Sequence, residues 1–153
     1  MRLRQAPAIE KTPEILLVDD HRQGLIARKS LLQELGYIVR TATNGEEALE
    51  LYAQHTFDVV VTDYRMPRMD GIELIRRIRC TQANARIIML SGYVEPLGLT
   101  EQTTGADVVV QKSAVEVPHL TRAVKRLLSN ASVRKPPAAA PPAAPLKRFK
   151  AEA

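Results

Sequence analysis

Five polar side chains stand at or just after the ends of four apolar segments, and their types are those of a phosphoryl-transfer site. They are Asp19, Asp20, Asp63, Ser91 and Lys112. Crowded carboxylates repel one another and favour a hard cation with oxygen ligands, a role that Mg²⁺ fits. An aspartate can attack phosphorus and form an aspartyl phosphate. Mg²⁺ and a lysine can neutralise the phosphoryl oxygens during in-line transfer, and a serine hydroxyl can donate to one of them.

The elements that must bring these side chains together are predicted by the apolar pattern. Uninterrupted apolar runs are typical of strands covered on both faces, and β-prone runs occur at 15–18, 37–39, 57–62, 87–90 and 108–110. Helical spacing of apolar residues lies at 22–35, 44–52, 72–79 and 120–128, with a weaker helix at 95–104. Asn44 and Glu47 have the spacing of a capping box at the start of the second helix.

Five strands that alternate with five helices predict an α/β fold, a doubly wound five-stranded parallel sheet with helices on both faces. Right-handed crossovers bring the carboxyl ends of all the strands to one edge, where such folds carry their sites. The three carboxylates, the hydroxyl and the ammonium group are therefore expected to meet at that edge.

The positive charge of the chain lies at its two ends. The 153 residues have a net charge of +5, but residues 1–13 contribute +2 and residues 130–153 contribute +4, which leaves −1 for 14–129. Five of the ten prolines fall within 136–145, and such a composition cannot build a core. The sequence predicts an N-terminal extension at 1–13, one domain at 14–129 and a disordered, basic Pro/Ala-rich tail at 130–153.

Composition excludes several classes of protein. Aromatic residues make up 4% of the chain and tryptophan is absent, which argues against a base-stacking platform, and the near-neutral core makes nucleic acid an unexpected partner. Cys80 is the single cysteine, so a disulfide framework is excluded. No apolar run approaches the ~18 residues of a membrane span, and the N-terminus lacks the apolar stretch of a signal peptide. We therefore expect a cytoplasmic protein.

At the level of motifs, the segment 15–128 resembles the receiver domain of two-component response regulators, of the CheY-like and flavodoxin-like kind. The similarity rests on ILLVDD at 15–20, DYRMPRMDG at 63–71, Ser91-Gly92 and Lys112. The D-x-x-M-P-x-M-D-G run is highly specific, whereas the acidic pair and the lysine alone would be weak signals. The resemblance implies the strand order 2-1-3-4-5.

The resemblance also implies roles for the site residues. Asp63 would be the phosphoacceptor, Asp20 a direct Mg²⁺ ligand and Asp19 a ligand mainly through water. The backbone carbonyl of Arg65 would be a further ligand, while Ser91 would be the switch hydroxyl. Lys112 would contact the phosphoryl group.

The partners implied by the resemblance are proteins. The phosphoryl donor would be a sensor histidine kinase or a phosphotransfer protein, docked on the helix that begins near Arg22. The domain would slowly hydrolyse its own acyl phosphate and pass the signal to a downstream protein partner that the sequence does not name.

Two positions depart from the receiver pattern. Ser113 replaces the proline that usually follows the lysine in a cis bond, and a non-proline cis bond costs about 3–4 kcal/mol. We therefore expect a trans bond and a changed direction for Lys112. Val109 stands where the family usually has an aromatic residue that moves with the switch hydroxyl, and a valine is too small for that motion.

These departures leave two functions open. The first is a phosphoacceptor switch without an output domain, acting in a phosphorelay or by protein contacts. The alternative is a receiver-like adaptor that binds partners regardless of phosphorylation. An enzyme is not expected, because Asp63-Tyr64-Arg65 lacks the second aspartate of a D-x-D phosphatase and no nucleotide-binding glycine loop follows the first strand. DNA binding through the tail alone is a further alternative.

Overall fold

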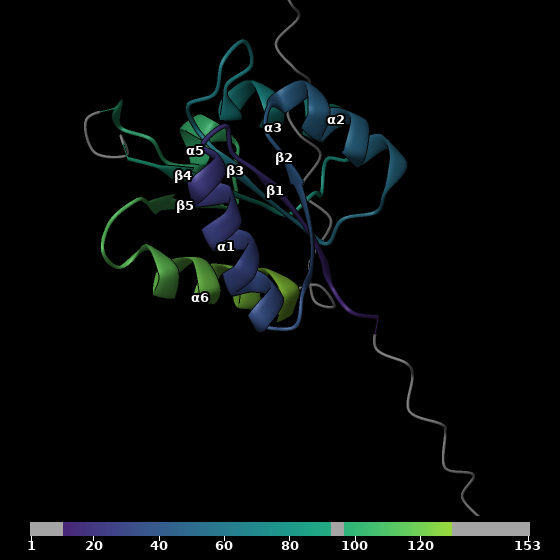
Figure 1. Cartoon of the computed structure of the whole chain (residues 1–153). Coiled ribbons are helices and arrows are strands. Elements are labelled where there is room, and N and C mark those ends of the chain that lie inside the picture. Colours follow the sequence, from purple (N-terminus) through teal and green to yellow (C-terminus); the bar gives the residue numbers. More distant parts are fainter. Residues whose placement is uncertain (1–10, 93–96, 130–153) are drawn as a thin grey trace, which may run out of the picture.

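The computed structural model describes residues 11–92 and 97–129, and it confirms the predicted parallel sheet. The strands are β1 (Glu14–Val18), β2 (Ile38–Ala42), β3 (Val59–Asp63), β4 (Ile87–Ser91) and β5 (Val108–Gln111). The helices are α1 (Arg22–Glu34), α2 (Gly45–Gln54), α3 (Gly71–Thr81), α5 (Glu101–Thr104) and α6 (Glu116–Ser129). All strand pairs are parallel, in the order β2-β1-β3-β4-β5 (Figure 1). The predictions for the two tails concern residues outside this description.

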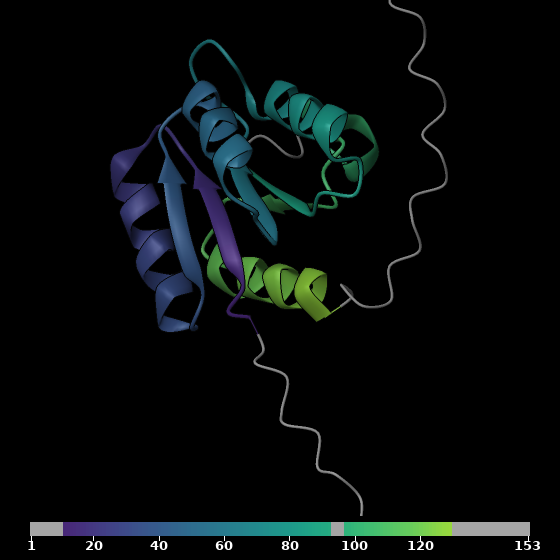
Figure 2. The same cartoon turned by 90° about the vertical axis from the view of Figure 1, so that its right-hand side faces the viewer.

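The sheet is covered on both faces, which explains its uninterrupted apolar strands. Helices α2 and α3 lie on one face, and α1 and α6 lie on the other (Figures 1 and 2). Side chains of successive strand residues point to opposite faces, so Leu16 and Val18 join the layer beneath α2 and α3, whereas Ile15 and Leu17 join the layer beneath α1 and α6. The central strands β3 and β4 are buried at every position.

Polar caps begin the helices that flank the site edge. Asn44 accepts the N–H of Glu47 at the start of α2, as the sequence predicts. The predicted capping box is not complete, because the Glu47 carboxylate accepts instead from the backbone N–H and the hydroxyl of Thr43. The sequence predicts a weak helix at 95–104. In the part of this range that the structure describes lies the four-residue helix α5, which Thr100 caps.

One arginine on α3 has a structural role that periodicity did not predict. Arg76 and Arg77 lie on the solvated face and pair with Glu73. Arg79 differs from both, because its guanidinium donates to the carbonyls of Ala83, Ala85 and Gly105 and pairs with Asp107 at 3.2 Å. The end of α3 is therefore tied to the segments that enter β4 and β5.

None of the helices in the described part of the chain combines the length and the apolar character that crossing a bilayer requires.

Candidate functional site

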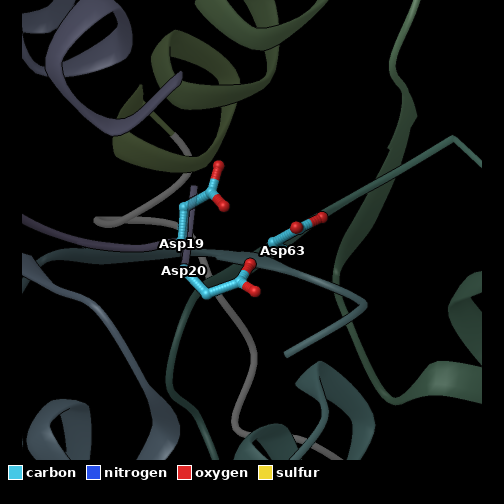
Figure 3. A group of neighbouring side chains, drawn as sticks. All are labelled: Asp19, Asp20 and Asp63. Atoms are coloured by element: carbon cyan, nitrogen blue, oxygen red, sulfur yellow. The ribbon is translucent and has the colours of Figure 1, made fainter. Parts of the chain in front are cut away.

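The strand order brings the five predicted side chains to the carboxyl edge of the sheet. Asp19 and Asp20 follow β1, Asp63 ends the neighbouring β3, Ser91 ends β4, and Lys112 follows β5. One carboxylate oxygen from each of the three aspartates lies within 4.8 Å of the others. Figure 3 shows these three side chains as neighbours, with the carboxylate of Asp19 turned toward the side of α1 and α6. The edge therefore holds a compact acidic pocket, formed by Asp19, Asp20 and Asp63.

Asp63 is a buried carboxylate of this pocket that is bonded to a lysine. The residue is 7% exposed, and its Oδ1 accepts from Lys112 Nζ at 2.8 Å and from the backbone N–H of Tyr64 at 2.9 Å. Burial raises the pKa of the Asp63 carboxyl, and the Asp19 charge adds to this, while the bonds from Lys112 and Tyr64 counteract it. A partly desolvated carboxylate beside one fixed cation is well suited to nucleophilic attack on a phosphoryl group.

Lys112 reaches Asp63 although the proline after it is missing. Cis peptide bonds are absent from the described residues, so the bond to Ser113 is trans as expected. The expected change in the direction of the lysine is wrong. Its backbone N–H donates to the carbonyl of Ser91 at 2.9 Å, which continues the β4–β5 ladder by one residue and aims the side chain at Asp63.

The loop after β3 is folded tightly against the strand end. The N–H of Gly71 donates to the carbonyl of Tyr64 at 2.7 Å, and Asp70 caps α3 through the N–H of Glu73. Met66 and Met69 anchor the loop in the core layer beneath α2 and α3. The loop and Asp20 line an open pocket of about 390 Å³ to which the exposed Arg65 also contributes.

Ser91 and Val109, the two positions that the resemblance links to switching, are buried to different degrees. Ser91 is 1% exposed at the end of β4. Val109 is partly buried and packs against the core layer beneath α2 and α3. A valine in this packed position has no aromatic ring to move between an inner and an outer site.

Sequence reasoning missed two charged residues beside the pocket. Arg28 of α1 pairs with Asp19 at 2.6 Å and with Glu116 of α6 at 2.7 Å. The one sequence signal for Arg28 is its place one helical turn after Gly24, on the face that looks back to the acidic pair. Glu116 carries no such signal, because 88 residues separate it from Arg28.

The acidic pocket fits a magnesium ion by its donors. It offers three carboxylates and no nitrogen or sulfur ligand, a set that hard cations prefer. Asp20 is exposed and lines the open pocket, as does Tyr64, the residue after Asp63. An ion could therefore enter from solvent. Asp19 is held by other groups on both oxygens, through His21 N–H and Arg28.

Comparison with known proteins agrees with this fold. A family model described as the response regulator receiver domain matches residues 15–125. A gliding motility regulatory protein of Myxococcus xanthus is 38% identical over 129 residues, which cover 80% of this chain but 16% of that protein. This chain thus spans a small part of that relative's length.

Solved structures show the same architecture. The response regulator protein TrrA of Thermotoga maritima, in complex with Mg²⁺-BeF, is 36% identical with a TM-score of 0.69, covering 76% of this chain and 99% of that one. A complex of the histidine kinase ThkA with TrrA matches with 37% identity and a TM-score of 0.69, covering 76% of this chain and 99% of the matched one.

A doubly wound sheet with three carboxylates and a lysine at its carboxyl edge, together with these matches, defines a signalling domain of the receiver class. The chain belongs to the response regulator receiver domain family. This is a family of two-component signalling domains and not a family of catalytic enzymes.

Proposed function

We propose that this chain accepts a phosphoryl group on Asp63 in a Mg²⁺-dependent reaction and acts as a switch or relay in two-component signalling. The observation that carries the proposal is the Lys112–Asp63 contact of 2.8 Å inside the acidic pocket. A buried carboxylate beside a cation and within reach of two more carboxylates is an unfavourable arrangement for stability alone. It is suited to a reaction that brings in a cation and a phosphoryl group.

The proposed transfer follows from the contacts of Asp63. Lys112 and the N–H of Tyr64 both bond to Oδ1 of the carboxylate, so we assign the attack on phosphorus to Oδ2. An O–P bond forms as the P–N bond of a donor phosphohistidine breaks, and the electron pair returns to the imidazole. Lys112 stabilises charge on the phosphoryl oxygens, and the hydroxyl of Ser91 can donate to one of them.

The metal would be held by residues already named. Asp20, Asp63 and the backbone carbonyl of Arg65 would be its direct ligands, and Asp19 would act mainly through water. Bound Mg²⁺ supplies positive charge for the phosphoryl oxygens. Slow hydrolysis of the acyl phosphate would return the domain to its starting state.

The test is the intact mass of the protein after incubation with acetyl phosphate. With Mg²⁺ we expect a single phosphoryl adduct that decays with time, is released by hydroxylamine and maps to Asp63 after borohydride reduction. With EDTA in place of Mg²⁺ we expect none. An adduct that forms equally well without the metal, or that maps elsewhere, would contradict the proposal.

Val109 supports one alternative, a receiver-like adaptor that binds partners regardless of phosphorylation. Its small, packed side chain cannot provide the aromatic motion described for the family pattern. The alternative requires that beryllofluoride leave the affinity for a partner protein unchanged. A ten-fold change, about 1.4 kcal/mol of coupling, would exclude it.

The upstream partner is proposed to be a histidine kinase or a phosphotransfer protein that docks on α1 and the start of α6. Ile26 is 64% exposed, Val115 and Val117 are each 50% exposed, and a pocket of about 190 Å³ lies between these helices. The related TrrA was solved with its histidine kinase ThkA. We take these exposed side chains as one apolar surface of α1 and α6, the helices that carry Arg28 and Glu116 beside the acidic pocket, and such a surface suits a partner that must bring a phosphohistidine to Asp63.

Ile26→Glu is expected to slow phosphoryl transfer from a protein donor at least ten-fold, because it places a charge in this apolar surface. The donors would be the autophosphorylated histidine kinases of the genome that encodes the chain, and phosphorylation by acetyl phosphate should stay at the wild-type rate. Ile38→Glu is the matched control, since Ile38 is 47% exposed and lies at the opposite edge of the sheet. Equal slowing by both variants would place the docking surface elsewhere.

The domain boundaries and the location of the protein are also proposals. We propose a receiver domain at 14–129 flanked by the extension 1–13 and the tail 130–153, a division that the match at 15–125 supports. We propose that the protein acts in the cytoplasm, through a downstream protein partner and not through nucleic acid.

A further inference from the structure

Arg28 donates to Asp19, the carboxylate of the acidic pocket that would reach a metal mainly through water. Its Nη1 donates to Asp19 Oδ2 at 2.6 Å, and Asp19 Oδ1 accepts the backbone N–H of His21 at 2.9 Å. The side chain of Asp19 is 2% exposed and that of Arg28 is 13% exposed. A charge-assisted bond in this protected position is strong, so both oxygens of Asp19 are engaged before any cation enters.

Glu116 holds the guanidinium in place from the other side. Arg28 Nε and Nη2 both lie 2.7 Å from Glu116 Oε1, which joins α1 to the first residue of α6. Burial lowers the pKa of Arg28, but the bonds and charges of Glu116 and Asp19 outweigh it, and the pKa is raised above its usual value. A guanidinium is always charged in proteins at physiological pH, so Arg28 places a fixed positive charge beside the pocket.

Gly24 provides the space through which Arg28 reaches the pocket. A Cβ atom on Gly24 would lie 2.9 Å from Arg28 Nη1 and 3.3 Å from Asp19 Oδ2. The nearest of these atoms is the end of a flexible side chain, so an added methyl group would displace the guanidinium and leave the backbone in place. The contact between Arg28 and Asp19 thus depends on a glycine at this turn of α1.

We propose that Arg28 is a positioning residue that weakens Mg²⁺ binding, by acting as a competing cation on Asp19. The inference rests on the proposed function, because it concerns the metal site of the same pocket. With the guanidinium in place, the Asp19 carboxylate is paired without a metal, and an entering ion meets a like charge. Removing that charge should tighten Mg²⁺ binding about ten-fold, equivalent to about 1.4 kcal/mol.

The test is a Mg²⁺ titration of the full chain at constant ionic strength, followed by the backbone amide shifts of Asp20, Asp63 and Tyr64. The same spectra report whether each variant is folded. We expect Arg28→Ala to bind Mg²⁺ about ten-fold more tightly than wild type, and Gly24→Ala to change affinity in the same direction. Arg28→Lys retains the charge and should return the affinity to within about three-fold of wild type.

Arg40→Ala is the matched control. It removes the same charge and breaks an ion pair with Glu14, at the first residue of β1 and therefore away from the acidic pocket. Its affinity for Mg²⁺ should equal that of wild type. A merely structural role of Arg28 would leave the affinity unchanged or lower it, because a loosened pocket binds less well.

The outcomes separate this inference from the proposed function. If wild type binds Mg²⁺, and folded Arg28→Ala and Gly24→Ala bind it no more tightly than wild type does, the role of Arg28 alone is overturned. No Mg²⁺-dependent shift in wild type or in any variant would overturn the proposed metal site and this inference with it.

Discussion

Asp63→Asn is expected to take up no phosphoryl group from acetyl phosphate and to be more stable than wild type at neutral pH without Mg²⁺. The amide has no charged oxygen to attack phosphorus, so the adduct should be absent from the mass spectrum. Burial is the largest influence on this carboxyl and opposes its charged form. Removing the charge should therefore raise the free energy of unfolding at neutral pH.

The stability gain of Asp63→Asn has a defined dependence on pH. The pKa of Asp63 is raised above 3.8 in the folded protein, so the folded state binds the proton more tightly than the unfolded state. The stability of wild type relative to the variant falls as pH rises from 3.8 through this raised pKa, and then stays constant. Urea unfolding of both proteins between pH 4 and pH 8 in EDTA would measure it.

Asp58→Asn is the control for this substitution. Asp58 accepts the N–H of Glu14 at 2.7 Å, at the amino edge of the sheet and away from the acidic pocket. This variant should be phosphorylated as wild type is and should gain no stability. A phosphoryl adduct on Asp63→Asn, or greater stability of wild type at neutral pH, would contradict the role and the environment assigned to Asp63.

Gly71→Ala is expected to destabilise the fold by about 3 kcal/mol and to abolish phosphorylation. A Cβ atom on Gly71 would lie 2.4 Å from the backbone oxygen of Asp63 and 3.1 Å from Tyr64 Cα. These are backbone atoms at the end of a buried strand and cannot yield as a flexible side chain can. The loop would have to move, and Asp63 would leave its position beside Lys112.

Urea unfolding and the acetyl phosphate reaction would measure both effects of Gly71→Ala. Gly92→Ala is the matched control for stability, because no atom of the residues that the structure describes lies within 4 Å of its added Cβ atom. That variant should remain within about 0.5 kcal/mol of wild type. Equal stability of the two variants would mean that the loop yields, and that Gly71 is not required for the close approach to Asp63.

The sequence alone determined the sheet, its edge and the residues that meet there. Continuous apolar runs such as Ile15–Val18 require cover on both faces, which parallel strands with crossover helices provide. Because the ends of such strands share one edge, Asp19, Asp63 and Lys112 could be placed together without coordinates. These predictions succeeded because they depend on local patterns and on general rules of topology.

The tertiary structure alone decided how the charges around that edge are paired. Arg28 with Glu116, and Arg79 with Asp107, join residues that are 88 and 28 positions apart. Whether such side chains meet depends on how each helix packs on the sheet and on the rotamers that this packing permits. Lys112 shows the same limit, because the ladder bond to Ser91 directs it to Asp63 where the missing proline had suggested otherwise. Long-range packing sets these contacts, and no local pattern encodes it.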